Sequence, residues 1–198
     1  MKSHTEVKTI LSGDGEAYLY RNFFCCEEAN ALFISLRDTI DWKHEPIWMF
    51  GKKVMQPRLT AWYGDEGKTY RYSGILMKPI MWTAGLIEVK NKIEEVTGAH
   101  FNSALLNLYR DGKDSMGWHR DNEPELGLSP VIASVSFGDT RRFLFRRYLE
   151  KKIKTEVSLE NGSLLLMRGE AQTHWEHSIP KTAMSVAPRI NITFRKII

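Results

Sequence analysis

The residues best suited to chemistry are His119 and Asp121, which stand two apart in the stretch Gly117-Trp-His119-Arg-Asp121-Asn-Glu123. Side chains two apart on an extended segment lie on the same face, so an imidazole nitrogen and a carboxylate oxygen could bind one metal ion. A second histidine would complete a 2-His-1-carboxylate triad, which leaves positions on a ferrous ion open for oxygen chemistry. By itself, this spacing more often marks a hydrogen-bonded His/Asp pair at a strand end.

Two histidines, His174 and His177, could supply the third ligand. They stand three apart, so on a strand they face opposite ways and only one of them can join the triad. The spacing does not decide between them.

The C-terminal segment alternates polar and apolar residues. Ile190, Ile192 and Phe194 share one face of a predicted strand, and the other face carries Arg189, Asn191, Thr193 and Arg195. The polar face either meets solvent or lines a barrel interior that holds a ligand. In the second case, the two guanidinium groups could hold a small dicarboxylate at both ends, with an amide and a phenol added by Asn107 and Tyr109.

The elements that must position these residues fit a single domain of 198 residues, 42% of them hydrophobic. Residues 1–17 are expected to form a short polar arm, followed by a strand over 18–24. Apolar spacing predicts a helix over 27–40 and a second one from near Pro79 to Gly98. The buried stripe of the second helix is predicted to comprise Trp82, Leu86, Val89, Ile93 and Val96.

Short strand-like runs separated by turn residues follow the second helix. They cover 103–109, 131–137, 142–147, 154–159, 163–167, 173–177 and 189–195. Helices first and many short strands afterwards indicate an α+β fold that is mainly β. We expect a double-stranded β-helix, or jelly roll, with the N-terminal helices packed on its outside and the metal ligands at one mouth.

Composition points to an intracellular protein, cytoplasmic in a prokaryote and nuclear in a eukaryote. There is no apolar run of about 18 residues and no signal-peptide core, so no membrane association is expected. The only cysteines, Cys25 and Cys26, are adjacent and such neighbours rarely form a disulfide. The net charge of +4 is small, but its sign is that of a nucleic-acid binder.

Four ordered motifs together closely resemble the AlkB family of Fe(II)- and 2-oxoglutarate-dependent dioxygenases, which demethylate nucleic-acid bases. They are Asn107-x-Tyr109, His119-Arg-Asp121, His177-Ser-x-Pro180 and Pro188-Arg189-Ile-Asn191-Ile-Thr193-Phe-Arg195. The resemblance runs from about Tyr18 to the C-terminus and is nearest to the members that act on duplex DNA.

The resemblance implies a role for each motif. His119, Asp121 and His177 would be the catalytic iron ligands, which leaves His174 beside them or in the core. The 2-oxoglutarate contacts would be Asn107, Tyr109, Arg189, Asn191, Thr193 and Arg195.

The resemblance also implies a reaction. The chain would reverse alkylation damage by oxidising N-methyl groups of bases such as 1-methyladenine and 3-methylcytosine in DNA, with duplex preferred. It would consume O2 and 2-oxoglutarate, release formaldehyde and succinate, and act as a monomer on alkylated DNA. The alternatives are a demethylase of single-stranded DNA or RNA, or a catalytically inactive nucleic-acid-binding module on the same scaffold.

Residues 45–75 would form nucleotide-recognition loops. In a finger loop, Phe50 would fill the gap left by a flipped base, with Gly51 and Lys52 beside it. Arg58 is expected near the flipped base or its phosphate. A pocket lid would comprise Tyr70, Arg71 and Tyr72, and Tyr72 would stack the base against His119.

Two further groups are expected on the substrate side. Asn122 and Glu123 would read the exocyclic group of the base, although an acidic residue is expected where Asn122 stands. A basic cluster would contact phosphates rather than merely face solvent, and it comprises Arg141, Arg142, Arg146, Arg147, Lys151, Lys152 and Lys154.

Overall fold

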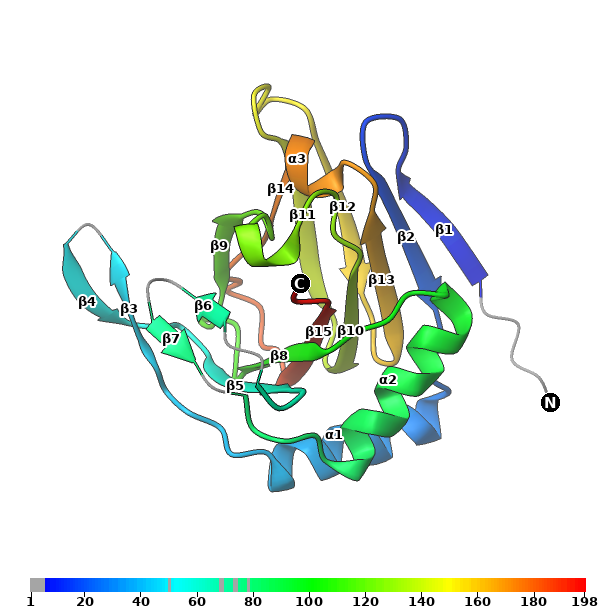
Figure 1. Ribbon diagram of the computed structural model, residues 1–198, viewed down its shortest axis with the longest axis vertical. Helices are drawn as coiled ribbons and strands as arrows, with labels where there is room; N and C mark the ends of the chain where they lie inside the picture. The colour runs from blue at the N-terminus through cyan, green and yellow to red at the C-terminus, as the bar shows by residue number, and fades with distance from the viewer. Residues whose placement is uncertain (1–5, 50, 68–69, 73–74, 78) are drawn as a thin grey trace.

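Two antiparallel β-sheets face each other and form the framework of the protein (Figure 1). The computed structural model describes residues 6–49, 51–67, 70–72, 75–77 and 79–198, without the side chains of 48, 49, 70–72 and 75–77. The larger sheet has the order β1-β2-β13-β10-β15-β8-β5 and the smaller one the order β12-β11-β14-β9. This confirms the predicted jelly roll.

The strands of the larger sheet are β1 (Glu6–Leu11), β2 (Glu16–Arg21), β13 (Ser163–Arg168), β10 (Ile132–Gly138), β15 (Arg189–Arg195), β8 (Ser103–Tyr109) and β5 (Leu59–Gly64). Those of the smaller sheet are β12 (Lys154–Leu159), β11 (Arg141–Arg147), β14 (Trp175–Ile179) and β9 (Met116–His119). Two hairpins lie outside both sheets, β3 (Pro46–Met49) with β4 (Lys52–Met55) and β6 (Tyr70–Tyr72) with β7 (Ile75–Met77).

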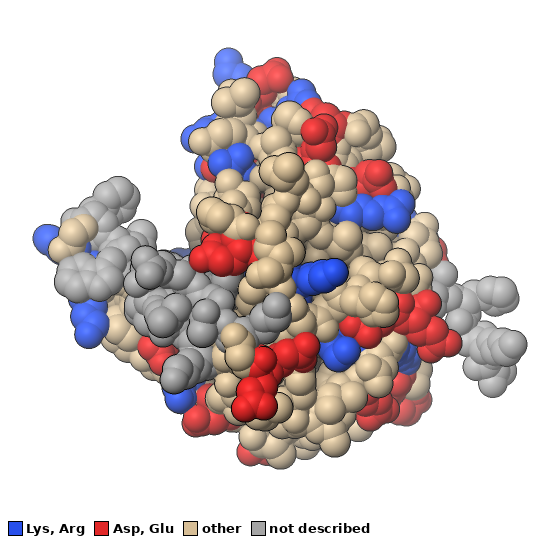
Figure 2. Space-filling model, in the orientation of Figure 1, with Lys and Arg blue, Asp and Glu red and all other residues tan. Residues whose placement is uncertain are grey.

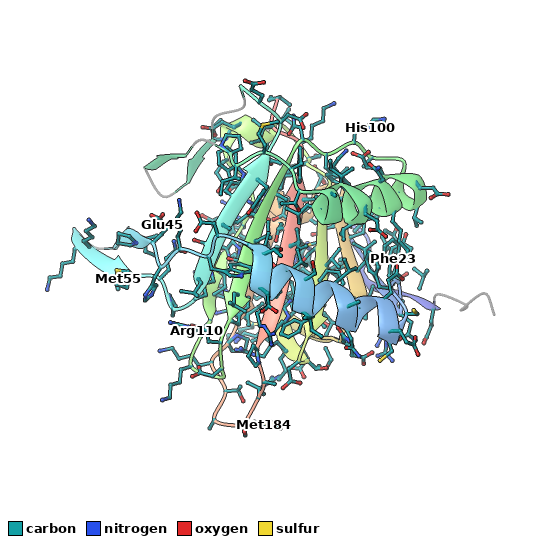
Figure 3. The ribbon with its side chains drawn as sticks, turned by 90° about the horizontal axis from the view of Figure 1, so that it is seen from below. Phe23, Glu45, Met55, His100, Arg110 and Met184 are labelled. Carbon is teal, nitrogen blue, oxygen red and sulfur yellow. The ribbon has the colours of Figure 1, made fainter. Side chains whose placement is uncertain are left out.

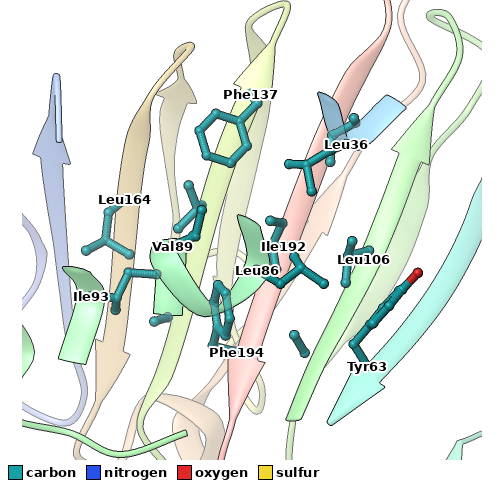
Figure 4. Packing of buried hydrophobic residues seen from close by; sticks show 14 of the residues in the cluster. Leu36, Tyr63, Leu86, Val89, Ile93, Leu106, Phe137, Leu164, Ile192 and Phe194 are labelled. Atoms are coloured by element: carbon teal, nitrogen blue, oxygen red, sulfur yellow. The ribbon is translucent and has the colours of Figure 1, made fainter. Parts of the chain in front are cut away.

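Helices α1 (Cys26–Thr39) and α2 (Ala84–Thr97) cover the outer face of the larger sheet, as Figure 3 shows from below. Leu86, Val89 and Ile93 of α2 are fully buried, and they pack over Ile192 and Phe194 of β15 (Figure 4). This confirms the predicted placement of the helices. Within the described ranges, no helix combines the length and apolar composition needed to cross a membrane.

The second helix is shorter than predicted. It begins at Ala84 rather than near Pro79, because the Thr83 side chain accepts a hydrogen bond from the Leu86 N–H and caps the first turn. Trp82 therefore precedes the helix, and it stacks on the Phe194 ring. Gly98 ends the helix in the left-handed region at φ 66°, as predicted. Val96 is 50% exposed, so its place in the buried stripe was wrong.

Three segments differ from the predicted elements. Residues 6–17 are no polar arm, because β1 pairs with β2 at the edge of the larger sheet, where only one side chain of β1 is buried. The predicted strand over 173–177 is instead the short helix α3 (Ala171–His174) followed by β14. Residues 45–75 include β5, whose side chains are largely buried, so this range is more than loops.

The central strand β15 separates two kinds of interior. Its Ile190, Ile192 and Phe194 face the helices, and its polar residues face the space between the two sheets. Pairing in register places Arg189 opposite Tyr109 and Asn191 opposite Asn107 of β8. The polar face of the last strand is therefore buried, as a ligand-holding barrel requires.

Candidate active site

Three side chains of types that bind metals meet where β9 and β14 pair. His119 lies opposite His177, their ring centroids are 4.2 Å apart, and Asp121 follows β9 directly. The closest ligand atoms of the three residues all lie within 4.8 Å of one another. Across the described residues, no other group of three or more His, Cys, Asp or Glu side chains is this close.

Hydrogen bonds orient His119 and Asp121 and leave one ligand atom of each available. His119 Nδ1 lies 2.9 Å from the Gly117 carbonyl oxygen, to which it donates as the N–H tautomer, so its Nε2 keeps a lone pair. Asp121 Oδ1 accepts from Arg195 Nη2 at 2.7 Å, and Asp121 Oδ2 lies 4.0 Å from His177 Nε2. Two imidazole nitrogens and one carboxylate oxygen suit a ferrous ion.

The protonation states also suit a metal. Burial, with a smaller effect of His119, lowers the pKa of His177 to about 3. Burial likewise lowers the pKa of His119. Burial alone would raise the pKa of Asp121, but its neighbours, above all the charged Arg195 that also donates a hydrogen bond to it, lower it further than burial raises it. At neutral pH both imidazoles are neutral and the carboxylate is ionised, which is the form that binds a cation.

A pocket lies between the two sheets beside His119, Asp121 and His177. Apolar side chains such as Leu105, Phe143 and Ile179 line part of it. Its polar lining comprises Asn107, Tyr109, Ser134, Asn191, Thr193 and Arg195. An apolar pocket with a few convergent polar groups is typical of a small-molecule site.

Arg189 is the strongest sign of an anionic ligand. It is fully buried, and its Nη2 donates to Ser136 Oγ at 2.8 Å. Its Nε and Nη1 have no hydrogen-bond partner in the part of the chain that the structure describes. Burial lowers the pKa of Arg189 to about 10, so it stays charged near neutral pH. A buried cation with unused donors is costly unless a ligand satisfies it.

The amide of Asn191 is used within the protein. Its Nδ2 donates to Ser134 Oγ and to the Val135 carbonyl oxygen, and its Oδ1 accepts from Thr193 Oγ1 at 3.0 Å. Asn191 therefore orients Ser134 and Thr193, whose hydroxyls line the pocket.

Arg58 is not a surface residue, so the predicted phosphate contact was wrong. It is 2% exposed, and its guanidinium donates to Asn107 Oδ1, Gln56 Oε1 and the Ser115 carbonyl oxygen. The bond to Asn107 is 2.7 Å long and fixes the orientation of that amide.

The substrate-side residues are only partly placed. Phe50 and the side chains of Tyr70, Arg71 and Tyr72 lie outside the described residues. Gly51 turns the β3–β4 hairpin at φ 74°, and Lys52 is exposed on β4. Asn122 is exposed, whereas Glu123 has a buried Oε2 without a hydrogen-bond partner among the described residues.

The predicted basic cluster is largely neutralised. Arg141 is buried, and Arg142, Arg146 and Arg147 pair with Glu156, Glu176 and Asp14. Figure 2 shows basic and acidic side chains interspersed on the face in view. Within the described chain, the exposed members without an ion pair are Lys151, Lys152 and Lys154.

Sequence reasoning missed several residues around the site, and it also misplaced one histidine. Gln172 Oε1 accepts from the Asp121 backbone N–H at 2.9 Å, and no sequence signal marks this residue. Ser134 and Ser136 could have been found, because they alternate with apolar residues on β10. His174 is half-exposed beside Glu170, so it lies neither in the core nor at the ligand cluster.

Comparison with known proteins agrees with this geometry. Residues 16–195 match the model of the 2OG-Fe(II) oxygenase superfamily. The chain is 41% identical to alpha-ketoglutarate-dependent dioxygenase alkB homolog 3 of Bos taurus, over 97% of this chain and 70% of the relative. It is 39% identical to the DNA oxidative demethylase ALKBH2 of Homo sapiens, over 90% of this chain and 72% of that relative.

A solved structure, that of OsALKBH1, has the same fold at a TM-score of 0.71 and 16% identity, with 96% of this chain and 100% of that chain covered. The two groups of relatives are about equally similar to this sequence, so identity does not separate them. The chain belongs to the 2OG-Fe(II) oxygenase superfamily and, as an AlkB-type dioxygenase, uses Fe(II), 2-oxoglutarate and O2.

Proposed function

We propose that this protein repairs alkylated DNA by oxidative demethylation of bases such as 1-methyladenine and 3-methylcytosine. It acts on duplex DNA in preference to single strands, as a monomer, and releases formaldehyde and succinate. The observation that carries the proposal is the His119, Asp121 and His177 cluster beside a pocket lined by Tyr109, whose ring centroid lies 5.3 Å from Cζ of the buried Arg189. Identity near 40% to proteins named DNA oxidative demethylase supports the choice of substrate.

His119, Asp121 and His177 would hold the iron. When bound, Fe(II) with 2-oxoglutarate and O2 supplies the oxidising reactivity. The chain contributes geometry, because Arg195 holds one oxygen of Asp121 and leaves the other directed toward His177. Gln172 accepts a hydrogen bond from the Asp121 backbone N–H and so fixes the backbone of that residue.

Arg189 and Tyr109 would bind the distal carboxylate of 2-oxoglutarate, with Arg195, Thr193 and Asn107 nearer the metal. Arg189 Nε and Nη1 have no partner among the described residues, so the guanidinium has donors left for carboxylate oxygens. Arg58 donates a hydrogen bond to Asn107 Oδ1, so the amide is oriented before the ligand binds.

A methylated ring nitrogen is inaccessible within a duplex, so the base must be flipped into the site. The β3–β4 hairpin projects from the body of the protein (Figure 1), and its position suits a finger that carries Phe50 into the gap. N-methylation at these positions makes the base cationic. The buried oxygen of Glu123, which has no hydrogen-bond partner among the described residues, suits recognition of that charge.

Phosphate contacts would come from the turn between β11 and β12. This turn carries Lys151 and Lys152, and Lys154 begins β12. All three side chains are exposed and no carboxylate of the described residues pairs with them. Lysines of this kind suit sequence-independent binding to a phosphate backbone.

Formaldehyde and succinate release from oligonucleotides that carry one methylated base, single-stranded or paired, tests the proposal. We expect both products with each substrate and faster release from the duplex, with Asp121→Ala as the inactive control. A clear preference for single strands would favour the single-strand demethylase. Absence of succinate under all conditions would favour an inactive binding module.

A further inference from the structure

Arg141 is a buried cation that the proposed reaction does not use. It opens β11, it is 3% exposed, and no carboxylate of the described residues forms an ion pair with it. Its guanidinium instead donates to three backbone carbonyl oxygens, those of Asp111 at 3.1 Å, Asp114 at 2.9 Å and Pro180 at 2.7 Å. Burying a charge against neutral carbonyls is expensive, which indicates that its position matters.

These three carbonyls belong to two segments that leave the active site. Residues 110–115 follow β8, which carries Asn107 and Tyr109, and Pro180 follows β14, which carries His177. The segments also touch directly, since the Thr182 N–H donates to the Gly112 carbonyl oxygen at 2.8 Å. A Cβ on Gly112 would lie 2.5 Å from the Thr182 carbonyl oxygen, so the two segments are in close contact and a side chain would not fit between them. Figure 3 shows this edge, where Arg110 and Met184 are labelled.

Arg141 also shares an aromatic neighbour with Arg189. Its Cζ lies 5.6 Å from the centroid of the Tyr109 ring, and the Cζ of Arg189 lies 5.3 Å from the same centroid. Tyr109 is 2% exposed and therefore fixed between its neighbours. Both cations lie within the range of a cation–π contact with this ring.

We propose that Arg141 is a positioning residue for the far end of the co-substrate pocket. This rests on the proposed placement of the distal carboxylate of 2-oxoglutarate at Arg189 and Tyr109. By connecting the segments after β8 and β14, Arg141 holds Tyr109 in place over Arg189. It also adds positive potential where the carboxylate binds, in surroundings that water does not screen. Its removal should therefore weaken binding of a distal carboxylate and spare the 2-oxo acid group near the metal.

A pair of ligands separates this role from general support of the fold. 2-Oxopentanoate has the chain length and 2-oxo acid group of 2-oxoglutarate but lacks the distal carboxylate. Dissociation constants for both acids are measured by calorimetry on the full chain with Mn(II) in place of iron, so that turnover does not interfere. The variants are Arg141→Met and Arg141→Lys, and thermal unfolding checks that each is folded.

A matched control accompanies them. Arg142→Met removes the next cation, which is exposed and paired with Glu156. This control should keep the ratio of the two dissociation constants found for the wild-type chain.

We expect Arg141→Met to weaken 2-oxoglutarate binding about tenfold, the size of effect typical of residues that orient a ligand-binding group without touching the ligand. Binding of 2-oxopentanoate should change less than about twofold. Arg141→Lys keeps the charge but cannot reach all three carbonyls, so its loss of affinity for 2-oxoglutarate should be smaller than that of the methionine variant. If Arg141→Met does not fold, the lysine variant provides the test. Equal changes for both acids, or none, would overturn the inference. If the wild-type chain binds both acids equally, the proposed carboxylate site itself fails, and the role of Arg141 fails with it.

Discussion

Asp121 makes three contacts at once, and each uses a different atom. Its Oδ1 accepts from Arg195, its backbone N–H donates to Gln172, and its Oδ2 faces His177. Because the first two contacts use atoms that a metal does not need, they orient Oδ2 without occupying it. The local sequence predicts the ligand, but only the fold supplies Arg195 and Gln172 from distant positions in the chain.

Replacing Asp121 by Ala should abolish succinate formation, since the site loses its only anionic ligand. The change also leaves Arg195 buried without its carboxylate, which should cost about 3 kcal/mol of stability. Asp121→Asn keeps an oxygen acceptor for Arg195 and should lose less stability while remaining inactive. Succinate assays and chemical denaturation of both variants check this, and substantial turnover by either would contradict the assignment of the metal ligands.

Gln172→Leu should lower metal affinity and turnover about tenfold, because the Asp121 N–H loses its acceptor and the carboxylate its fixed direction. The measurement is Fe(II) or Mn(II) titration, followed by 2-oxoglutarate turnover. Thr173→Val, an exposed neighbour on the same short helix, serves as control and should bind metal as the wild type does. Equal metal affinity in the two variants would show that Gln172 only packs.

The segment that joins β8 to β9 is held by a buried carboxylate. Asp114 accepts hydrogen bonds from the backbone N–H, Nε and Nη2 of Arg110, and its side chain is nearly inaccessible. Burial alone would raise the pKa of Asp114, but the bonds from Arg110 lower it below the ordinary value of 3.8. The segment therefore depends on an ionised group.

The lowered pKa of Asp114 determines how its contribution to stability changes with pH. A carboxyl group whose folded-state pKa is lowered stabilises the fold above its unfolded pKa, and this contribution is lost as the pH falls through the folded value. Asp114→Asn should therefore lower the free energy of unfolding by about 1–2 kcal/mol at pH 7, an amount reduced by the exposure of Arg110. Urea denaturation from pH 7 down to pH 3 should show the gap between variant and wild type narrowing below pH ~4. A gap independent of pH would contradict an ionic role.

The β3–β4 hairpin is the element on which the proposed duplex preference depends. Phe50→Ala should slow repair of paired substrates about tenfold and leave single-strand repair nearly unchanged, because only a duplex has a gap to fill. Val54→Ala on the same hairpin is the matched control, since Val54 is exposed on β4. Demethylation rates on both forms of one oligonucleotide provide the test, and equal losses would count against the finger.

Charge on the smaller sheet is largely balanced locally among the described residues. Three arginines of this sheet are in ion pairs, so the net charge of +4 is not concentrated there as one large basic patch. Binding to DNA should therefore depend on a few lysines, rather than on the seven cations that the sequence places close together.

The salt dependence of DNA binding tests this. Each phosphate contact contributes about −0.9 to the slope of log affinity against log salt, so replacing Lys151, Lys152 and Lys154 by Ser should reduce the slope by up to about three. Arg142→Ser, at a paired position, should leave the slope unchanged. Fluorescence anisotropy with an unmodified duplex at several salt concentrations measures it, and a wild-type affinity independent of salt would rule out phosphate binding here.

The sequence by itself determined the elements with strong periodicity and the chemistry of their faces. Strands β8 and β15 have the predicted bounds, and their alternating residues face the predicted sides, because period two is a local property of extended chain. The buried stripe of α2 follows from helical spacing in the same way, except at Val96. The weakly patterned β1 was missed, since an exposed edge strand carries little apolar signal.

Only the tertiary structure decided which of the residues meet. The choice between His177 and His174 depends on the pairing of β14 with β9, and no local pattern encodes that long-range register. Arg141 and Arg142 are neighbours in sequence, yet one is buried among carbonyls and the other is exposed beside Glu156. Residue type fixes what a side chain can do, whereas its charge, exposure and partners are set by the distant segments that fold against it.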